Sequence, residues 1–351
     1  ITINPNIMFK EYDYLSSSSV ALKKHYSKLT KDLSKKFYLK SSEYIIDIGC
    51  NDGIILNTYD KKYKNLIGIE PSNAINKIKN KNIFKINDFF NNQTLKIIKK
   101  YTDSPRIITI TNVFAHIDKI NNFTYNLSKL SNDNTIIVIE FPYLVDMINK
   151  NLYDLIYHEH LYYLSITPLR KFLKKFELNI FDIKKFFIGA SGPCLRVYIS
   201  KNKKIKIKDI VAKYLKNESI WGIKKISTYN KFQNNVNSHK NKLEKLLNKL
   251  IAENNKIGCF SAPAKGNTLL NFINLNNQIK IVSENNKRKI GKVSPGKHLK
   301  VVSDNDFIKN DIDYALLLSW NYLNFFIKKS KFISKGKGFI IPFPKIKIIY
   351  F

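Results

Sequence analysis

The chain has 351 residues, of which 60 are lysine or arginine and 27 are aspartate or glutamate, giving a formal net charge of +33. Hydrophobic residues make up 44% and aromatic residues 13%, which excludes intrinsic disorder, collagen-like repetition and a small disulfide-stapled fold. This length predicts more than one domain, because single cores stop growing at roughly 250–300 residues.

The positive charge is carried almost entirely by lysine. The arginines are Arg106, Arg170, Arg196 and Arg288, and the lysines are spread along the whole chain among many asparagines and isoleucines. Nucleic-acid recognition favours arginine, whose planar fork binds two acceptors at once. The charge therefore indicates a general drift in composition and does not favour a nucleic-acid partner, although a positive field would attract phosphate-bearing ligands.

Cysteine usage and hydropathy predict a cytoplasmic protein. Cys50, Cys194 and Cys259 lie far apart and form neither a disulfide framework nor a CxxC zinc site, which is typical of a reducing compartment. No apolar run approaches the ~20 residues of a membrane span, and no signal-peptide pattern opens the chain, so no membrane partner is expected. The first residue is Ile1 and not methionine, which leaves open whether the chain is a fragment lacking its own beginning.

The first part of the chain alternates between strand-like and helix-like segments. Residues 1–43 form an N-terminal helical segment on the substrate side, in which a serine run caps a helix over 20–37. Short apolar runs then predict buried parallel strands at 44–48, 66–69, 83–86, 107–111 and 135–140. Helical patterns lie between them at 54–59, 73–79, 93–100 and 120–130. This alternation predicts an α/β fold with an open, doubly wound parallel sheet, assigned to residues 44–202.

The sequence pattern changes beyond residue 200. Residues 203–255 are a lysine-rich helical connector in which Leu243, Leu246, Leu247 and Leu250 share one face. A second α/β series follows, with strands predicted at 257–260, 279–282, 299–302, 314–318 and 338–342. It predicts a second, smaller Rossmann-like domain at 256–351.

A glycine-bearing loop follows the first predicted strand, in the sequence Asp47-Ile48-Gly49-Cys50-Asn51-Asp52-Gly53. Glycines let the backbone approach a ligand closely, and a following helix offers free N–H groups. Glu70 ends the second strand, where a carboxylate can accept both hydroxyls of a ribose. Asp88 and Phe89 end the third and suit the amine and the face of an adenine. The series resembles the S-adenosylmethionine-binding signature of class I methyltransferases.

Histidines mark a second motif, Tyr157-His158-Glu159-His160. It could bind a metal, supply a general base oriented by its neighbours, or be a surface loop without a role. His116 lies just past the fourth strand, at the carboxyl edge where doubly wound sheets bind ligands, although a core histidine is an alternative. The remaining histidines are interpreted as solvent-facing: His25, His239 and His298.

A third motif opens the second domain, where a strand runs into the small-residue loop 261–268. Such a loop, with Lys265 as a point charge, could cradle a diphosphate, or it could be a tight strand-to-helix turn.

Together these motifs resemble the sugar C-methyltransferases, which methylate C-3 of nucleotide-linked 4-keto-deoxysugars. The matching stretches recur in order along nearly the whole chain, at 11–17, 48–53, 68–72, 87–90, 112–116, 157–160, 262–268, 295–298 and 318–321. The Cys-Asn-Asp-Gly and Glu-His motifs are more specific than the glycine loop alone. The family usually begins with a four-cysteine zinc domain that is absent from this sequence, so zinc is expected only if such a lobe exists.

The resemblance implies a role for each motif. His160 would be the catalytic base, with Glu159 as orienting group, Tyr157 and Tyr12 as donors (Tyr14 being the fallback for Tyr12) and His116 near the keto or hydroxyl edge. S-adenosylmethionine would be bound by the following residues: Gly49, Cys50, Asn51, Asp52, Gly53, Glu70, Asp88, Phe89 and Asn112. A sugar nucleotide would lie between the two domains, with Lys265 and Asn267 as its contacts. The protein would be a monomer or a weak homo-oligomer.

Two alternatives stay open at this point. The chain could methylate another acceptor, such as a small metabolite or RNA. It could also be a non-catalytic protein that binds a sugar nucleotide or the cofactor.

Overall fold

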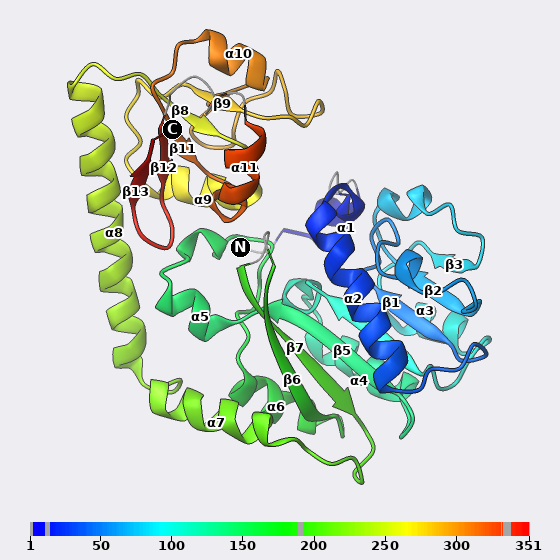
Figure 1. The fold of residues 1–351 in the computed structure, drawn as a ribbon. Coiled ribbons are helices and arrows are strands. Elements are labelled where there is room, and N and C mark those ends of the chain that lie inside the picture. The colour runs from blue at the N-terminus through cyan, green and yellow to red at the C-terminus, as the bar shows by residue number, and fades with distance from the viewer. Residues whose placement is uncertain (1–2, 11–14, 189–191, 331, 333–337, 351) are drawn as a thin grey trace. The chain divides into compact units, whose positions relative to one another are not determined.

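The computed structural model describes residues 3–10, 15–188, 192–330, 332 and 338–350. The chain forms two compact units, the first comprising Ile1–Leu144 with His158–Trp221 and the second Val145–Tyr157 with Gly222–Phe351. Each unit is built around one sheet whose central strands are parallel (Figure 1). The short segment 145–157 therefore leaves the first unit and returns, and it packs with the second.

The first unit contains a seven-stranded sheet. Its strands run in the spatial order β3 (Ile83–Ile86), β2 (Leu66–Ile69), β1 (Ile45–Ile48), β4 (Ile107–Thr111), β5 (Ile136–Pro142), β7 (Gly192–Ser200) and β6 (Asn179–Ile188). The first five strands are parallel, and β7 is antiparallel to both β5 and β6. The isoleucine-rich central strands are buried on both faces, as parallel strands covered by helices must be.

Helix α2 (Val20–Lys36) covers one face of this sheet (Figure 1). The side chain of Ser19 caps the helix by accepting a hydrogen bond from the Leu22 amide. Leu22, Leu29 and Leu33 recur at helical spacing and are buried in the same cluster as side chains of β1, β4 and β5. Burial of each such leucine stabilises the fold by about 1.5–3 kcal/mol. The helix is thus packed firmly onto the sheet.

Shorter helices complete the first unit. They are α1 (Pro5–Lys10), η1 (Ser16–Ser18), η2 (Leu56–Thr58), η3 (Asn73–Lys77), α3 (Asn92–Ile98), η4 (Phe114–His116), α4 (Ile120–Leu130), α6 (Ile166–Lys174) and α7 (Asp209–Trp221).

The second unit contains a six-stranded sheet. Its order is β10 (Lys300–Val302), β9 (Ile281–Ser283), β8 (Ile257–Phe260), β11 (Tyr314–Leu317), β12 (Gly338–Ile341) and β13 (Lys347–Ile349), of which β13 alone is antiparallel to its neighbour. The helices are α8 (Ile226–Ala252), α9 (Ala264–Phe272), α10 (Asp304–Lys309), η7 (Trp320–Tyr322) and α11 (Leu323–Lys329). The inserted segment carries η5 (Tyr153–Leu155) and most of α5 (Leu144–Asn149).

The predicted α/β architecture, with two sheets of mainly parallel strands, is confirmed. Two predicted helices are wrong in kind, because 54–59 and 73–79 hold only the short 3-10 helices η2 and η3. In η3 the Ile78 amide donates back three residues to Ile75, whose side chain is buried together with that of Ala74. A tight turn buries these side chains between β2 and β3 without several full helical turns.

Candidate active site

The loop after β1 has a backbone that glycine makes possible. Gly49, Asn51 and Gly53 have φ values of 74°, 50° and 76°. A Cβ atom on Gly49 would lie 2.2 Å from Cγ2 of Val113, so a side chain there would collide with the segment after β4. The amides of Gly49 and Cys50 donate to the Ile69 carbonyl at 2.8 and 3.1 Å, which ties the loop to β2.

Glu70 lies directly after β2 and faces this loop. Its side chain is buried, its Oε2 accepts from the Asn51 amide at 2.9 Å, and its Oε1 accepts from the Ser72 amide at 2.9 Å. A carboxylate offers about four acceptor positions, so roughly two remain for other donors. Fixed acceptors beside a glycine turn fit the two hydroxyl groups of a ribose.

Asn51 and Asp52 direct their side chains to the N-terminal segment. Asn51 Oδ1 accepts from the Ser16 amide at 2.9 Å, and the Asp52 carboxylate accepts from the Ser17 amide at 3.1 Å. These two side chains therefore hold η1 on the glycine loop. Cys50 is buried, and burial raises the pKa of its thiol well above the ordinary value, so it fills space as a neutral side chain.

Asp88 and Phe89 lie after β3, both half-buried. Asp88 Oδ1 accepts from the Phe89 amide at 2.7 Å, and Oδ2 accepts from the Asn91 side chain at 3.2 Å. The carboxylate is thereby oriented at the same edge of the sheet as Glu70.

Asp47 lies within β1, two residues before Gly49. Its side chain is buried, and its Oδ1 accepts from the Thr109 hydroxyl at 2.6 Å. Burial raises the pKa of Asp47 to about 7, and the nearby carboxylates of Glu70 and Glu140 act in the same direction. Oδ2 is buried without a hydrogen-bond partner among the residues that the structure describes.

His116 and His160 meet at the end of β4. The amides of Leu161 and Tyr162 donate to the Ala115 carbonyl at 2.9 and 3.3 Å, which fastens the segment after His160 to η4. The two imidazole rings pack edge to face with their centroids 4.9 Å apart. Burial lowers the pKa of His116 to about 3, and the neighbouring His160 adds to the effect, so His116 is neutral at ordinary pH.

The other residues of the histidine motif are placed differently. Tyr157 and Glu159 are half-buried, and the boundary between the two units falls directly after Tyr157. Asn112, also half-buried, has a φ of 55° and donates its amide to the Glu140 carbonyl at 2.9 Å. Tyr12 and Tyr14 lie outside the described residues.

Lys265 belongs to a polar cluster within the second unit. Its buried Nζ donates to Asn321 Oδ1 and lies 4.3 Å from the ring centroid of Trp320. The Trp320 indole donates to Asp154 Oδ2 at 2.7 Å. Burial lowers the pKa of Lys265 to about 8, whereas the Asp154 charge acts in the opposite direction. Asn267 is half-buried on the same helix, α9.

This cluster occupies a position that open α/β sheets use for ligands. The strands β8 and β11 are adjacent, and the chain leaves β8 toward β9 on one side and β11 toward β12 on the other. Ligands bind outside the carboxyl ends of such strands, where the strand order reverses.

Two histidines were interpreted wrongly as solvent-facing. His25 lies in a buried ion-pair cluster with Glu140, and His239 donates its Nε2–H to the Pro342 carbonyl at 2.7 Å while Nδ1 lies 3.0 Å from the Tyr153 hydroxyl. Both carry a sequence signal, because His25 is three residues after Leu22 and His239 four before Leu243, on the apolar face of each helix.

No group of three or more His, Cys, Asp or Glu side chains within the described part of the chain could hold a metal ion. Among the same residues, no helix combines the length and apolar character needed to span a membrane.

The strand order of the first sheet, with a glycine turn after β1 and a carboxylate after β2, defines the class I fold of S-adenosylmethionine-dependent methyltransferases. A family model described as a methyltransferase domain matches residues 21–182, and one described as a C-methyltransferase C-terminal domain matches residues 190–344. The C-methyltransferase NovU of Streptomyces niveus is 26% identical over 351 residues, covering 99% of this chain and 83% of the relative. The chain is thus an S-adenosylmethionine-dependent C-methyltransferase.

Two further similarities cover less of the chain. An uncharacterized methyltransferase of Schizosaccharomyces pombe is 40% identical over 45 residues, which are 13% of this chain and 17% of that protein. A solved S-adenosylmethionine-dependent methyltransferase from Anabaena variabilis is 13% identical with a TM-score of 0.41, covering 57% of this chain and 99% of that one.

Proposed function

We propose that this C-methyltransferase methylates C-3 of a nucleotide-linked 4-ketosugar, with His160 as the base that removes the C-3 proton. The observation that carries the proposal is the packing of His160 against His116 at the carboxyl edge of the first sheet. The sequence motifs that resemble sugar C-methyltransferases support the same acceptor.

The chemistry requires a base that works at neutral pH. A 4-keto group acidifies the neighbouring C-3 hydrogen, and an ordinary imidazole has a pKa of about 6.5, close to the working pH. The C-3–H bond breaks with its proton passing to an imidazole nitrogen of His160, and the electron pair, shared with the keto oxygen as an enolate, forms the new bond to the methyl carbon. The bond between that carbon and sulfur would break at the same time, with its electron pair staying on sulfur. S-adenosylmethionine, when bound, supplies that methyl group on a positively charged sulfur.

His116 suits a different task. Its imidazole is neutral, since burial lowers its pKa to about 3. A neutral imidazole can donate a hydrogen bond to an oxygen that gains negative charge, without first losing a proton. We assign it to the keto oxygen, with Glu159 as orienting group and Tyr157 and Tyr12 as further donors.

The glycine loop and the strand ends beside it fit the cofactor. Gly49 and Gly53 give the loop its positive-φ backbone and its close approach to Val113 and Ile78. Glu70 retains acceptor positions for the ribose hydroxyls, and Asp88 and Phe89 are assigned to the adenine. Lys265 and Asn267 of the second unit are assigned to the diphosphate of the substrate.

A labelling experiment tests the proposal. The purified protein is incubated with S-adenosylmethionine labelled in its methyl group and with a panel of nucleotide-linked 4-ketosugars, and products are analysed by mass spectrometry. We expect a mass gain of one methylene unit on at least one ketosugar and none on the matching 4-hydroxy sugars. Transfer to RNA or to an unrelated metabolite alone would overturn the acceptor, and cofactor binding without any transfer would overturn the catalytic role.

A further inference from the structure

We infer that His25 is a positioning residue for cofactor binding, because it fixes helix α2 so that η1 stays on the glycine loop. The inference rests on the proposed cofactor site at that loop. It concerns a side chain that touches neither the loop nor the catalytic histidines in the contacts described above.

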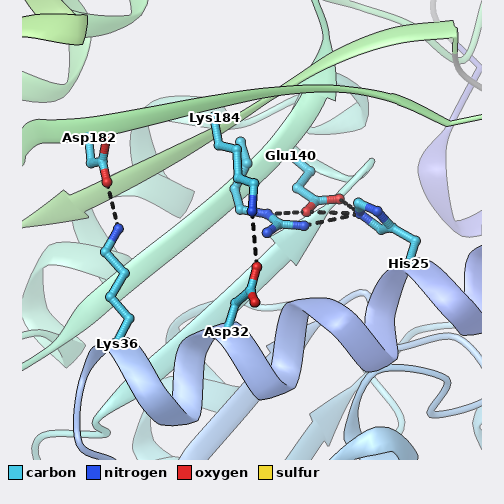
Figure 2. A network of polar contacts seen from close by, with 7 residues as sticks. His25, Asp32, Lys36, Glu140, Asp182 and Lys184 are labelled. Atoms are coloured by element: carbon cyan, nitrogen blue, oxygen red, sulfur yellow. Dashed lines mark hydrogen bonds and ion pairs between the residues drawn. The ribbon is translucent and has the colours of Figure 1, made fainter.

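His25 is part of a buried cluster that joins α2 to two strands. Its Nε2 lies 3.0 Å from Glu140 Oε2 and 3.1 Å from Arg196 Nη2, and Arg196 Nε donates to Glu140 Oε1. Figure 2 shows His25 reaching from α2 to the Glu140 carboxylate. Only 1% of the Glu140 side chain, 3% of that of Arg196 and 15% of that of His25 is exposed. Phe186 packs on the histidine ring, with centroids 4.6 Å apart.

The cluster lies at the ligand-binding edge of the sheet. Glu140 pairs in register with Thr111, the last residue of β4, and its carbonyl accepts from the Asn112 amide at 2.9 Å. The carboxyl ends of parallel strands share one edge, so the cluster is level with the segment that leads to His116. His25 therefore anchors α2 to buried residues of the same sheet that carries the site.

The N-terminal end of α2 is linked to the glycine loop through η1. Ser19 caps the helix and directly follows η1, whose Ser16 and Ser17 amides donate to the side chains of Asn51 and Asp52. The Asn51 amide in turn donates to Glu70, the residue assigned to the ribose. Positive φ at non-glycine residues persists only where the surroundings hold it, so a loosened η1 would relax the loop.

A second anchor on the same helix provides a control. Asp32 pairs with Lys184 at 3.0 Å and Lys36 with Asp182 at 2.6 Å, both further along α2 (Figure 2). The Asp32 and Lys184 side chains are 36% and 46% exposed. Exposed pairs contribute little, whereas removing one member of a buried cluster leaves the others short of a partner. Comparing an Asp32 variant with a His25 variant thus separates a general effect on α2 from an effect on the site.

The test measures cofactor binding and turnover in matched variants. Isothermal titration with S-adenosylhomocysteine gives Kd, and methyl transfer gives KM for S-adenosylmethionine and kcat. For His25→Ala we expect Kd and KM to rise about tenfold or more, with kcat at saturating cofactor within about twofold, because only the fraction of molecules whose loop is held in place binds the cofactor. His25→Gln, whose amide offers a donor and an acceptor, should recover most of the affinity. Asp32→Ala should match the wild type.

Several outcomes would overturn the inference. An unchanged Kd in folded His25→Ala would do so, as would an equal loss in Asp32→Ala, or a loss in His25→Gln as large as in His25→Ala. If His25→Ala does not fold, His25→Leu keeps the contact with Phe186 and is measured instead. Glu70→Gln distinguishes the two proposals, because an unchanged Kd there overturns the cofactor site itself, whereas a loss there with none at His25 overturns only the positioning role.

Discussion

The imidazole rings of His116 and His160 pack edge to face with centroids 4.9 Å apart, although they belong to separate motifs. The hydrogen bond from the Leu161 amide to the Ala115 carbonyl, at 2.9 Å, holds the two segments together. One of the rings is kept neutral by burial, since the pKa of His116 is lowered to about 3. Two histidines side by side can therefore do different work.

His116 is expected to stabilise the developing oxyanion as a neutral hydrogen-bond donor. Because its imidazole is neutral throughout the working range, His116→Asn should lower kcat by about 100-fold, the size of effect typical for one donor to an oxyanion. The acidic limb of the kcat profile should keep its midpoint, since His116 does not titrate there. A pH–rate profile of both proteins from pH 5 to 9 is the measurement. A shifted acidic midpoint in the variant would show that His116 itself is the titrating group.

The raised pKa of Asp47 should make the free energy of unfolding depend on pH. Its pKa rises from an ordinary 3.8 to about 7 in the folded protein, so the folded state binds this proton more tightly than the unfolded chain. The resulting stabilisation is complete below pH 4 and is lost as the pH rises through 7. Relative to Asp47→Asn, the wild type should therefore lose on the order of 4 kcal/mol between pH 4 and 9. Urea unfolding of both proteins at the two pH values tests this, and a pH-independent difference would contradict it.

The charge of Lys265 should make the affinity for an anionic substrate depend on pH. Burial lowers the pKa of its ammonium to about 8, so the positive charge is present below that pH and is lost above it. The KM for the sugar nucleotide should rise between pH 7 and 9, while the KM for S-adenosylmethionine should not. In Lys265→Met the substrate KM should be high at every pH. The assignment fails if the variant keeps the wild-type profile.

The Glu70 carboxylate is expected to contribute directly to the affinity for the cofactor. Its carboxylate already accepts two backbone hydrogen bonds at 2.9 Å and has acceptor positions left for the ribose. Hydrogen bonds to charged groups contribute about 1.5–3 kcal/mol, so Glu70→Gln should weaken S-adenosylhomocysteine binding by about 10–100-fold. Asp88→Asn, at the adenine end, is a companion variant that should lose less. Titration calorimetry measures both.

Local sequence patterns predicted most of the framework. Buried parallel strands are short isoleucine-rich runs, followed here by Gly49, Glu70 and Asn112, so β1, β2 and β4 could be predicted closely. The insertion of 145–157 into the second unit could not be predicted, because no change in composition marks this segment. Its contact partners also lie more than eighty residues away in the sequence, as in the contact of Tyr153 with His239.

The site was only partly predictable, for a related reason. The positions of Glu70 and Gly49 follow from strand ends, which meet at one edge of a parallel sheet. The His25–Glu140–Arg196 cluster joins a helix and two strands whose charged residues look ordinary one at a time. Only the packing of α2 on the sheet brings these side chains together, and the lysine-rich sequence around His25 suggested a solvated face instead.

The role of His160 as the base is tested most directly by measuring methyl transfer by His160→Gln to the ketosugar that the wild type accepts. We expect a loss in kcat of about 100-fold or more, because a general base contributes typically 10²–10⁴-fold. The Kd for S-adenosylhomocysteine should stay within about twofold, since His160 lies outside the glycine loop. A variant that binds the cofactor normally and transfers the methyl group at the wild-type rate would contradict the assignment of His160 as the base.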